Sequence, residues 1–215
     1  MKTILAPLVT SARGRFGGSV FSVWKGVTLV RRFASPSNPQ STTQVQVRNI
    51  MRNLTRIYIQ LSTEWRATWE SYAVGKPLIG RNVMIARNVA GLKGQANYAN
   101  FVPAPGDASC VPPGGATFTA GIGQITIAVT EPAVPTGWVI TGAIGACIKD
   151  LDPDAVQTWS NCRPYEGIDL TSPYSIVISG LTPAQPYRCS AWLKWLAPDG
   201  TTRYSTAITG TATPT

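Results

Sequence analysis

The apolar residues of this chain follow two different periods, and the period changes near residue 105. Between Val47 and Leu61 they recur every three or four positions, which is the spacing of a helix with one buried stripe. Beyond residue 116 they alternate with polar or small residues, as in strands with one buried face. The alternation is clearest at Ile125, Ile127 and Val129 and at Tyr174, Ile176 and Ile178. The pattern therefore predicts an α+β half followed by an all-β half.

The first half opens with an antiparallel hairpin. Residues 17–24 have the pattern of a strand, Lys25-Gly26 of a turn, and residues 27–33 of the returning strand. Before it, residues 1–9 are apolar but broken by Pro7, which favours an ordered arm or short strand over a signal peptide.

A stretched connector and three helices follow the hairpin. The pairs Ser35-Pro36 and Asn38-Pro39 hold the connector extended, because the residue before a proline avoids helical geometry. Ser41 or Thr42 then caps the first helix. A second helix restarts at residues 62–64 with Trp65, Trp69 and Tyr72 on one face, and a third covers residues 83–92. We place this basic hairpin-plus-helices domain at residues 1–102.

The pattern of the second half predicts an antiparallel β-sandwich. Residues 103–116 are rich in Pro, Gly and Ala, as in a linker, and the sandwich follows at residues 117–215. Alternation from Tyr187 to Trp195 predicts a long strand with Trp192 on the face away from the core. Such a Trp is either a surface ring covered by a neighbouring loop or an anchor for a partner. The turn Pro198-Asp199-Gly200 leads to a final strand near residues 203–209.

Charge divides along the same line as the periods. Residues 1–105 hold 14 Lys and Arg but only Glu64 and Glu70, whereas residues 106–215 hold 5 basic and 8 acidic residues. In the predicted first helix, Arg48, Arg52 and Arg56 stand four residues apart with no acid among them, and like charges at this spacing repel. The stripe is either a solvated face or a contact for an anionic partner, which is nucleic-acid phosphate or an acidic protein surface. The candidate partner-binding residues are Arg13, Arg15, Arg31, Arg32, Arg48, Arg52, Arg56 and Trp192.

The composition argues against catalysis and against a bound cofactor or metal. The chain has no histidine, which removes the usual general base and the commonest metal ligand. Cys110, Cys147, Cys162 and Cys189 are too widely spaced for a zinc site, and are either buried thiols or one or two disulfides. The run Asp150-x-Asp152-x-Asp154 lacks the later Gly and Glu of a calcium loop, which favours an acidic surface turn.

One series of motifs runs through the first half of the chain. The residues that form it are Trp24, Lys25, Gly26, Arg31, Asn38, Pro39, Gln44, Arg48, Trp65, Arg66, Trp69 and Tyr72. In these motifs residues 13–101 resemble a recurrent domain of uncharacterised phage and prophage structural proteins, which share a Gly-rich hairpin with a W-K-G…V-R turn, an N-P…T…Q…R connector, a helix, and then L-T…R-x-x-W…Y-A. The resemblance implies a virion component and assigns no activity.

Residues 174–213 resemble the end of a fibronectin type III domain. Gly180-Leu181-Thr182-Pro183 followed by Tyr187 matches the corner before that family's penultimate strand, and Ser205 and Thr211 fit its last strand. The Trp of the family's early strand is absent from residues 125–129. The resemblance implies an Ig-like sandwich that serves as a binding or spacing module.

We therefore expect a bacteriophage virion structural protein, placed in head decoration, neck or tail, that is assembled in the host cytoplasm. Its expected partners are other virion proteins and copies of itself, with no membrane. The alternative is a DNA-binding or packaging-associated phage protein that uses the basic first half.

Overall fold

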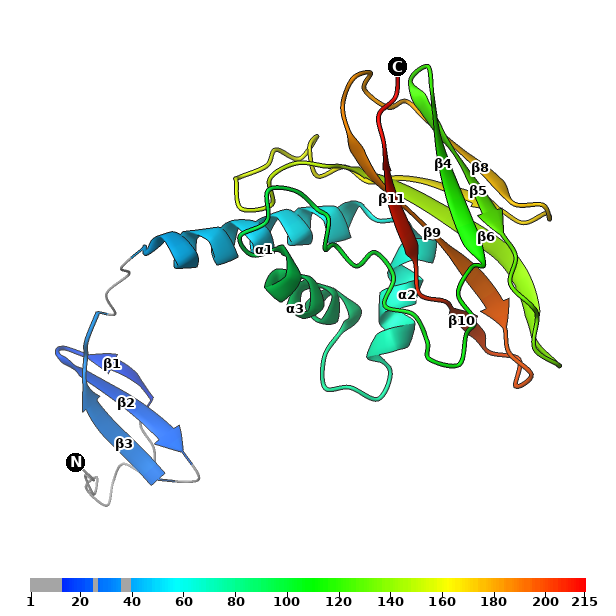
Figure 1. The fold of residues 1–215 in the computed structure, drawn as a ribbon. Helices are drawn as coiled ribbons and strands as arrows, with labels where there is room; N and C mark the ends of the chain where they lie inside the picture. The colour runs from blue at the N-terminus through cyan, green and yellow to red at the C-terminus, as the bar shows by residue number, and fades with distance from the viewer. Residues whose placement is uncertain (1–12, 25–26, 36–39) are drawn as a thin grey trace. The chain divides into compact units, whose positions relative to one another are not determined.

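The computed structural model describes residues 13–24, 27–35 and 40–215 (Figure 1). Chain contacts divide it into one unit that ends at Gln40 and a second, the main unit, that runs from Ser41 to Thr215. The arm expected at residues 1–9, the Lys25-Gly26 turn and most of the proline connector lie outside the described residues.

The described part of the first unit is a three-stranded antiparallel sheet, the N-terminal sheet. Its strands β1 (Gly14–Phe16), β2 (Ser19–Trp24) and β3 (Val27–Arg32) lie in the order β1-β2-β3. The sequence predicted β2 and β3 but not β1. Gly17 begins the turn between β1 and β2 with a φ of 54°, a left-handed conformation that glycine adopts without strain.

The main unit begins with three helices, α1 (Thr42–Gln60), α2 (Thr63–Ala73) and α3 (Gly80–Leu92). The stripe of α1 that the sequence predicted is buried through Ile50, Leu54 and Ile57. Ser62 caps α2 by accepting a hydrogen bond from the Trp65 backbone N–H at 3.1 Å. Among the described helices, none combines the length and apolarity that a membrane span requires.

Two sheets follow the helices. One contains β4 (Gly115–Gly121), β5 (Gln124–Thr130) and β8 (Ser175–Ser179). The other contains β6 (Val139–Lys149), β7 (Tyr165–Asp169), β9 (Tyr187–Leu196), β10 (Thr202–Tyr204) and β11 (Ile208–Ala212), with β10 and β11 both pairing with β9. The final strand expected near residues 203–209 is thus split in two. Buried residues of β5 and β8 pack on β6 and β9, so the predicted β-sandwich is confirmed.

The corner before β9 has the geometry that the fibronectin type III resemblance implied. The Thr182 backbone N–H donates to the Tyr187 hydroxyl oxygen at 2.9 Å, which ties the start of β9 to the preceding turn. This is the tyrosine corner of Ig-like sandwiches. Two residues later, Cys189 faces Cys147 of β6 across the sheet, and their Sγ atoms lie 3.0 Å apart. All four cysteines are buried thiols.

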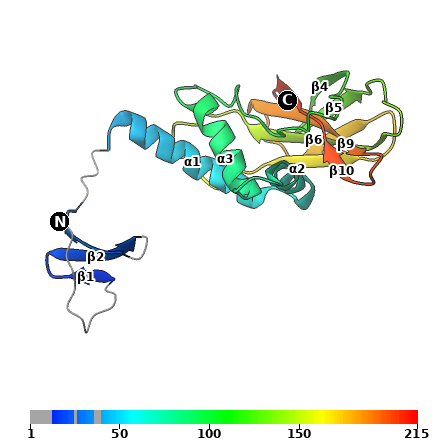
Figure 2. The same cartoon turned by 90° about the horizontal axis from the view of Figure 1, so that it is seen from below.

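The three helices cover the outer face of the five-stranded sheet, so the main unit has three layers (Figures 1 and 2). One hydrophobic cluster joins Trp65 of α2 to Ile144 of β6 and Trp192 of β9, while a second fills the sandwich. The main unit therefore starts at Ser41, and not at residue 117 where the sequence placed the sandwich domain.

The predicted linker at residues 103–116 is a packed strap within that unit. Pro103, Ala104 and Pro105 are buried. The Pro103 carbonyl oxygen accepts hydrogen bonds from both indole N–H groups of α2, from Trp65 at 2.7 Å and from Trp69 at 2.9 Å. The Pro- and Gly-rich composition of the strap suits an irregular path across Trp65 and Trp69. A free linker has the same composition, so composition alone does not distinguish the two.

Candidate protein-interaction surface

The N-terminal sheet has an apolar side chain on each of its faces. The register aligns Arg15, Val20 and Arg31 across the three strands, so these side chains share one face with Leu29. The other face carries Phe16 and Arg32, with further apolar residues at Phe21, Val23 and Val30. Among residues 13–23 and 27–35 none is buried, and Phe16 is 82% exposed. Each face therefore presents described side chains that a partner can contact.

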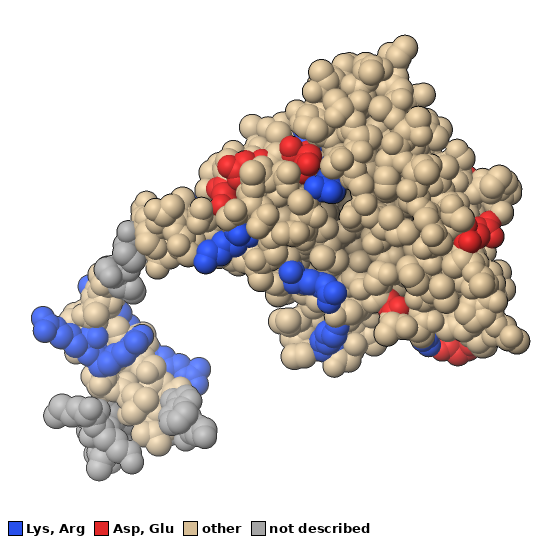
Figure 3. Space-filling model, in the orientation of Figure 1, with Lys and Arg blue, Asp and Glu red and all other residues tan. Residues whose placement is uncertain are grey.

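The four predicted arginines of this sheet are exposed. Arg13, Arg31 and Arg32 stand in or beside β1 and β3. The Arg15 guanidinium lies 3.8 Å from the Phe33 ring centroid, and its Nε donates to the Gly17 carbonyl at 3.1 Å. Figure 3 shows Lys and Arg side chains over this sheet with no Asp or Glu among them. The first acidic residue of the whole chain is Glu64.

The three arginines of α1 differ in their exposure and contacts. Arg48 and Arg52 are exposed. Arg56 is half-buried, because its guanidinium donates to the Gln157 carbonyl and lies 5.4 Å from the Trp159 ring centroid. Arg56 therefore serves the fold of the main unit, and only the first two residues of the stripe present a surface.

A polar seam beside this stripe escaped the sequence analysis. The Asn53 amide is fully buried and donates to the Pro153 and Ala155 carbonyls at 3.0 and 2.7 Å, while its Oδ1 accepts from the Gln157 N–H at 3.2 Å. Asn49 donates to the Asp154 carbonyl at 2.8 Å. The seam fastens the loop between β6 and β7 along α1, and its only sequence signal was an Asn repeated at helical spacing.

The three aspartates of the acidic run stabilise this loop. Asp150 accepts from the Tyr98 N–H at 2.9 Å and lies 3.8 Å from Arg188. Asp152 accepts from the Asp154 N–H at 2.8 Å, and Asp154 accepts from the Gly94 N–H at 3.2 Å. Within the described residues, no group of three His, Cys, Asp or Glu side chains gathers as metal ligands do.

Trp192 is fully buried, which makes its assignment as a partner-binding residue wrong. Its ring lies 5.3 Å from that of Trp65, centroid to centroid, at an angle of 52°. The sequence correctly placed Trp192 on the face opposite the sandwich core. That face is covered by the helices, a contact between segments more than 100 residues apart that strand alternation does not reveal.

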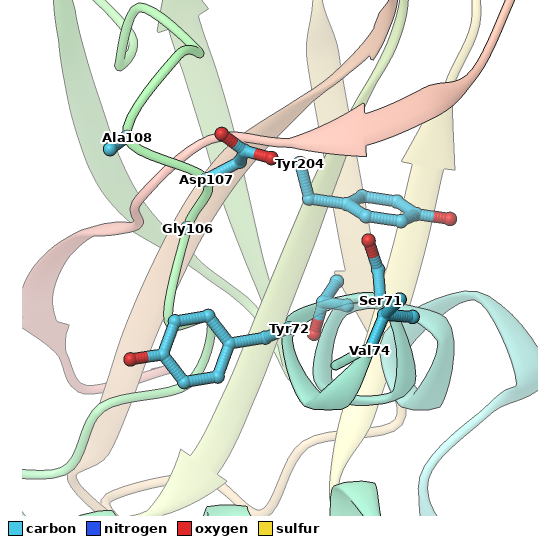
Figure 4. A pocket seen from close by; sticks show the side chains of 8 residues that line it. Ser71, Tyr72, Val74, Gly106, Asp107, Ala108 and Tyr204 are labelled. Atoms are coloured by element: carbon cyan, nitrogen blue, oxygen red, sulfur yellow. The ribbon is translucent and has the colours of Figure 1, made fainter. Parts of the chain in front are cut away.

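A pocket of about 280 Å³ lies where α2 meets the strap (Figure 4). Ser71 and Tyr72 project from α2, Val74 follows the last residue of that helix, and Asp107 and Tyr204 come from the facing segments. Hydrogen bonds from the Ser109 hydroxyl and backbone N–H lower the pKa of Asp107. Burial, with the nearby Glu64, raises the pKa of Tyr204 to about 12. Asp107 thus stays anionic and Tyr204 protonated near neutrality, which suits hydrogen bonding more than proton transfer.

Comparisons with known proteins do not assign this chain to a family. No protein-family model and no curated protein matches the chain. The solved structures that are similar to it include a computationally redesigned β-sandwich protein (17% identity, 49% of this chain, 90% of that chain, TM-score 0.35) and a myokine (14% identity, 49% of this chain, 97% of that chain, TM-score 0.34). Such low values carry no information on function. The β-sandwich itself, consistent with an Ig-like or fibronectin type III-like fold, rests on the strand order and the tyrosine corner.

Proposed function

We propose that the protein is a structural component of a bacteriophage virion that acts by protein–protein binding, with the N-terminal sheet as its docking element. The resemblance of residues 13–101 to phage and prophage structural proteins suggests the particle. Head decoration, neck and tail all fit, with capsid, neck or tail proteins and other copies of this chain as partners, assembled in the host cytoplasm.

The observation that carries the docking role is the exposure of the N-terminal sheet. A small sheet gains independent stability by burying an apolar face, and here none of residues 14–23 and 27–32 is buried. Partner contact on one face would bury residues such as Val20 and Leu29 and thereby complete a core. The sheet is thus suited to become ordered as it docks.

The charge of the sheet indicates what it meets. Arg13, Arg15, Arg31 and Arg32 stand in a segment without a single acid, so the complementary surface is acidic. Long-range attraction between such surfaces speeds encounter and weakens with salt. The main unit, which consists of the sandwich and its helical layer, is suited to spacing or to contact with neighbours.

Particle occupancy tests the docking role. Arg31→Gln with Arg32→Gln in the full chain should lower the copy number per particle, measured by quantitative mass spectrometry of purified virions. The matched control is Lys76→Gln with Arg163→Gln, which also removes two exposed charges, but from the main unit. Wild-type occupancy of the first variant would overturn the docking role, and absence of the unmodified protein from particles would overturn the proposed function.

The same cationic sheet favours one alternative, binding of DNA by a packaging-associated protein. Anisotropy of a labelled duplex separates the two. DNA binding would give an affinity that falls steeply with salt, with a slope that shrinks when Arg31 and Arg32 are neutralised. Lack of binding at low salt would exclude this alternative.

A further inference from the structure

An apolar groove runs between α1 and α3 on the surface of the main unit. It has a volume of about 560 Å³ and is lined by Met51 of α1 and by Asn82, Ile85, Ala86, Val89 and Ala90 of α3. Met51 is 46% exposed although it lies beside the buried stripe of its helix. Ala86 and Ala90 are exposed, and their short side chains leave space between the larger side chains that line the groove.

Both helices that form this groove carry exposed cations. They are Arg52 of α1, Arg81 of α3 and Lys93 at the end of α3. Arg87 of α3 points elsewhere, because its guanidinium donates to the Tyr72 hydroxyl at 2.9 Å. Figure 3 shows Lys and Arg side chains over α1 and α3 on the face in view, and acidic side chains along the upper edge of α1. One of these acids, Asp154, is bound to the Gly94 backbone N–H at 3.2 Å.

The carboxylates of the helical layer do not balance these charges, because both are bound within the fold. Glu64 pairs with Lys194 at 2.9 Å. Glu70 accepts from the Tyr58 hydroxyl at 2.6 Å and from the Gly80 backbone N–H at 3.2 Å. An apolar groove edged by positive charge is complementary to an apolar stripe edged by negative charge.

We infer that the groove between α1 and α3 binds an acidic amphipathic helix of another protein. A helix laid in a groove is a recurrent mode of peptide recognition, with anchors at positions i, i+3 or i+4, and i+7. From Asn82 to Ala90 the groove follows about 12 Å of α3, at ~1.5 Å per residue. That length matches two turns of a bound helix, with acidic residues on either side of its apolar stripe.

Charge and packing exclude the occupants that this chain itself offers. Its first 63 residues contain no acid, so its own N-terminal segment is repelled by the basic rim. Two copies joined through this face would place like charges together. The buried stripes of α1, α2 and α3 already lie in the core of the main unit. The bound helix therefore comes from a different protein, and this site is independent of the docking role proposed for the N-terminal sheet.

A designed peptide tests the site with the full-length protein. The probe is a labelled peptide of about 15 residues with Leu at i, i+3, i+4 and i+7 and with Glu on its other face, and fluorescence anisotropy gives its affinity. The control peptides carry Lys in place of Glu, or the same acidic composition in shuffled order. We expect the patterned acidic peptide alone to bind, with amide NMR shifts centred on Met51, Ala86 and Val89.

Substitutions in the protein complete the test. Ala86→Gln fills the groove from an exposed helical position and should weaken binding by about tenfold or more, whereas Ala133→Gln, in an exposed loop, should not. Arg52→Gln with Lys93→Gln should weaken binding and flatten its salt dependence.

Three outcomes would overturn the inference. They are equal binding of the Lys peptide, unchanged binding by Ala86→Gln, and self-association of the chain that Ala86→Gln abolishes. The last would identify a second copy as the occupant. Each can occur whether or not the protein enters a virion, so failure here is distinguishable from failure of the proposed function.

Discussion

Replacement of Trp192 by Ala tests whether the helices and the sandwich form one cooperative unit. Trp192 extends from the central strand β9 into the helical layer, is fully buried and packs against Trp65 of α2. If the two layers unfold together, the substitution destabilises both. If the helices belonged to a separate domain, as the sequence suggested, only a local effect would follow.

The magnitude follows from the burial of the indole. A tryptophan buries about 200 Å², worth ~5 kcal/mol at ~25 cal/mol per Å², and the contact with the Trp65 ring adds about 1 kcal/mol. Against this, the Trp192 Nε1–H has no hydrogen-bond partner among the described residues, and its burial costs about 2 kcal/mol. The expected net loss is about 4 kcal/mol, within the usual range for such truncations. Trp192→Phe, which removes the unpartnered N–H and keeps a ring, should cost less than about 1 kcal/mol.

Urea unfolding followed by far-ultraviolet circular dichroism and by tryptophan fluorescence measures both effects. Trp159→Ala is the matched control, because that ring is 51% exposed. The two probes should give one coincident transition for the native chain, shifted strongly only by Trp192→Ala. Separate transitions, or a loss of less than about 1 kcal/mol in the free energy of unfolding for Trp192→Ala, would refute the claim that the helices and the sandwich form one cooperative unit.

Three further predictions follow from the main unit. Asn53→Ala should cost about 3 kcal/mol and raise hydrogen exchange at residues 153–157, because three hydrogen bonds to that loop are lost; unchanged exchange there would contradict the seam. Burial raises the pKa of Glu166 above its ordinary value although Ser62 donates two hydrogen bonds to it. Its contribution to stability is therefore largest below the unfolded pKa and is lost as pH rises through the folded pKa, and Glu166→Gln should reduce that slope in unfolding titrations. A thiol reagent should find no reactive cysteine in the native protein and four in denaturant, since burial raises the pKa of Cys110 and of Cys162 to about 11; two in denaturant would indicate a disulfide.

Local signals predicted most of the elements. The apolar stripe of α1, the restart of a helix at residues 62–64 and the alternation in β5, β8 and β9 each depend on neighbours within a few residues, and the structure contains all of them. Ser41 stands at the N-cap of α1 as expected, but its side chain makes no capping hydrogen bond. The short strand β1 was missed because its three residues, Gly-Arg-Phe, lack a strand pattern of their own.

What the sequence did not predict depends on contacts between distant segments. The strap at Pro103 has the composition of a linker, and its burial under Trp65 and Trp69 comes from the helices around it. Trp192 and Arg56 were assigned correct faces of their elements, but what covers those faces comes from the other end of the chain. Of the candidate site, the sequence identified the exposed arginines of the N-terminal sheet, and it missed the groove between α1 and α3.

The helix-over-sheet packing also governs when the chain can fold during its synthesis. The helical layer is complete by Leu92, but β9, the strand whose Trp192 packs against Trp65, ends at Leu196. A ribosome adds about 5–20 residues each second, so the nascent helices wait several seconds before Trp65 meets Trp192. During that interval the growing chain is exposed to aggregation or to capture by chaperones, and a truncated product that lacks β9 would remain in that state.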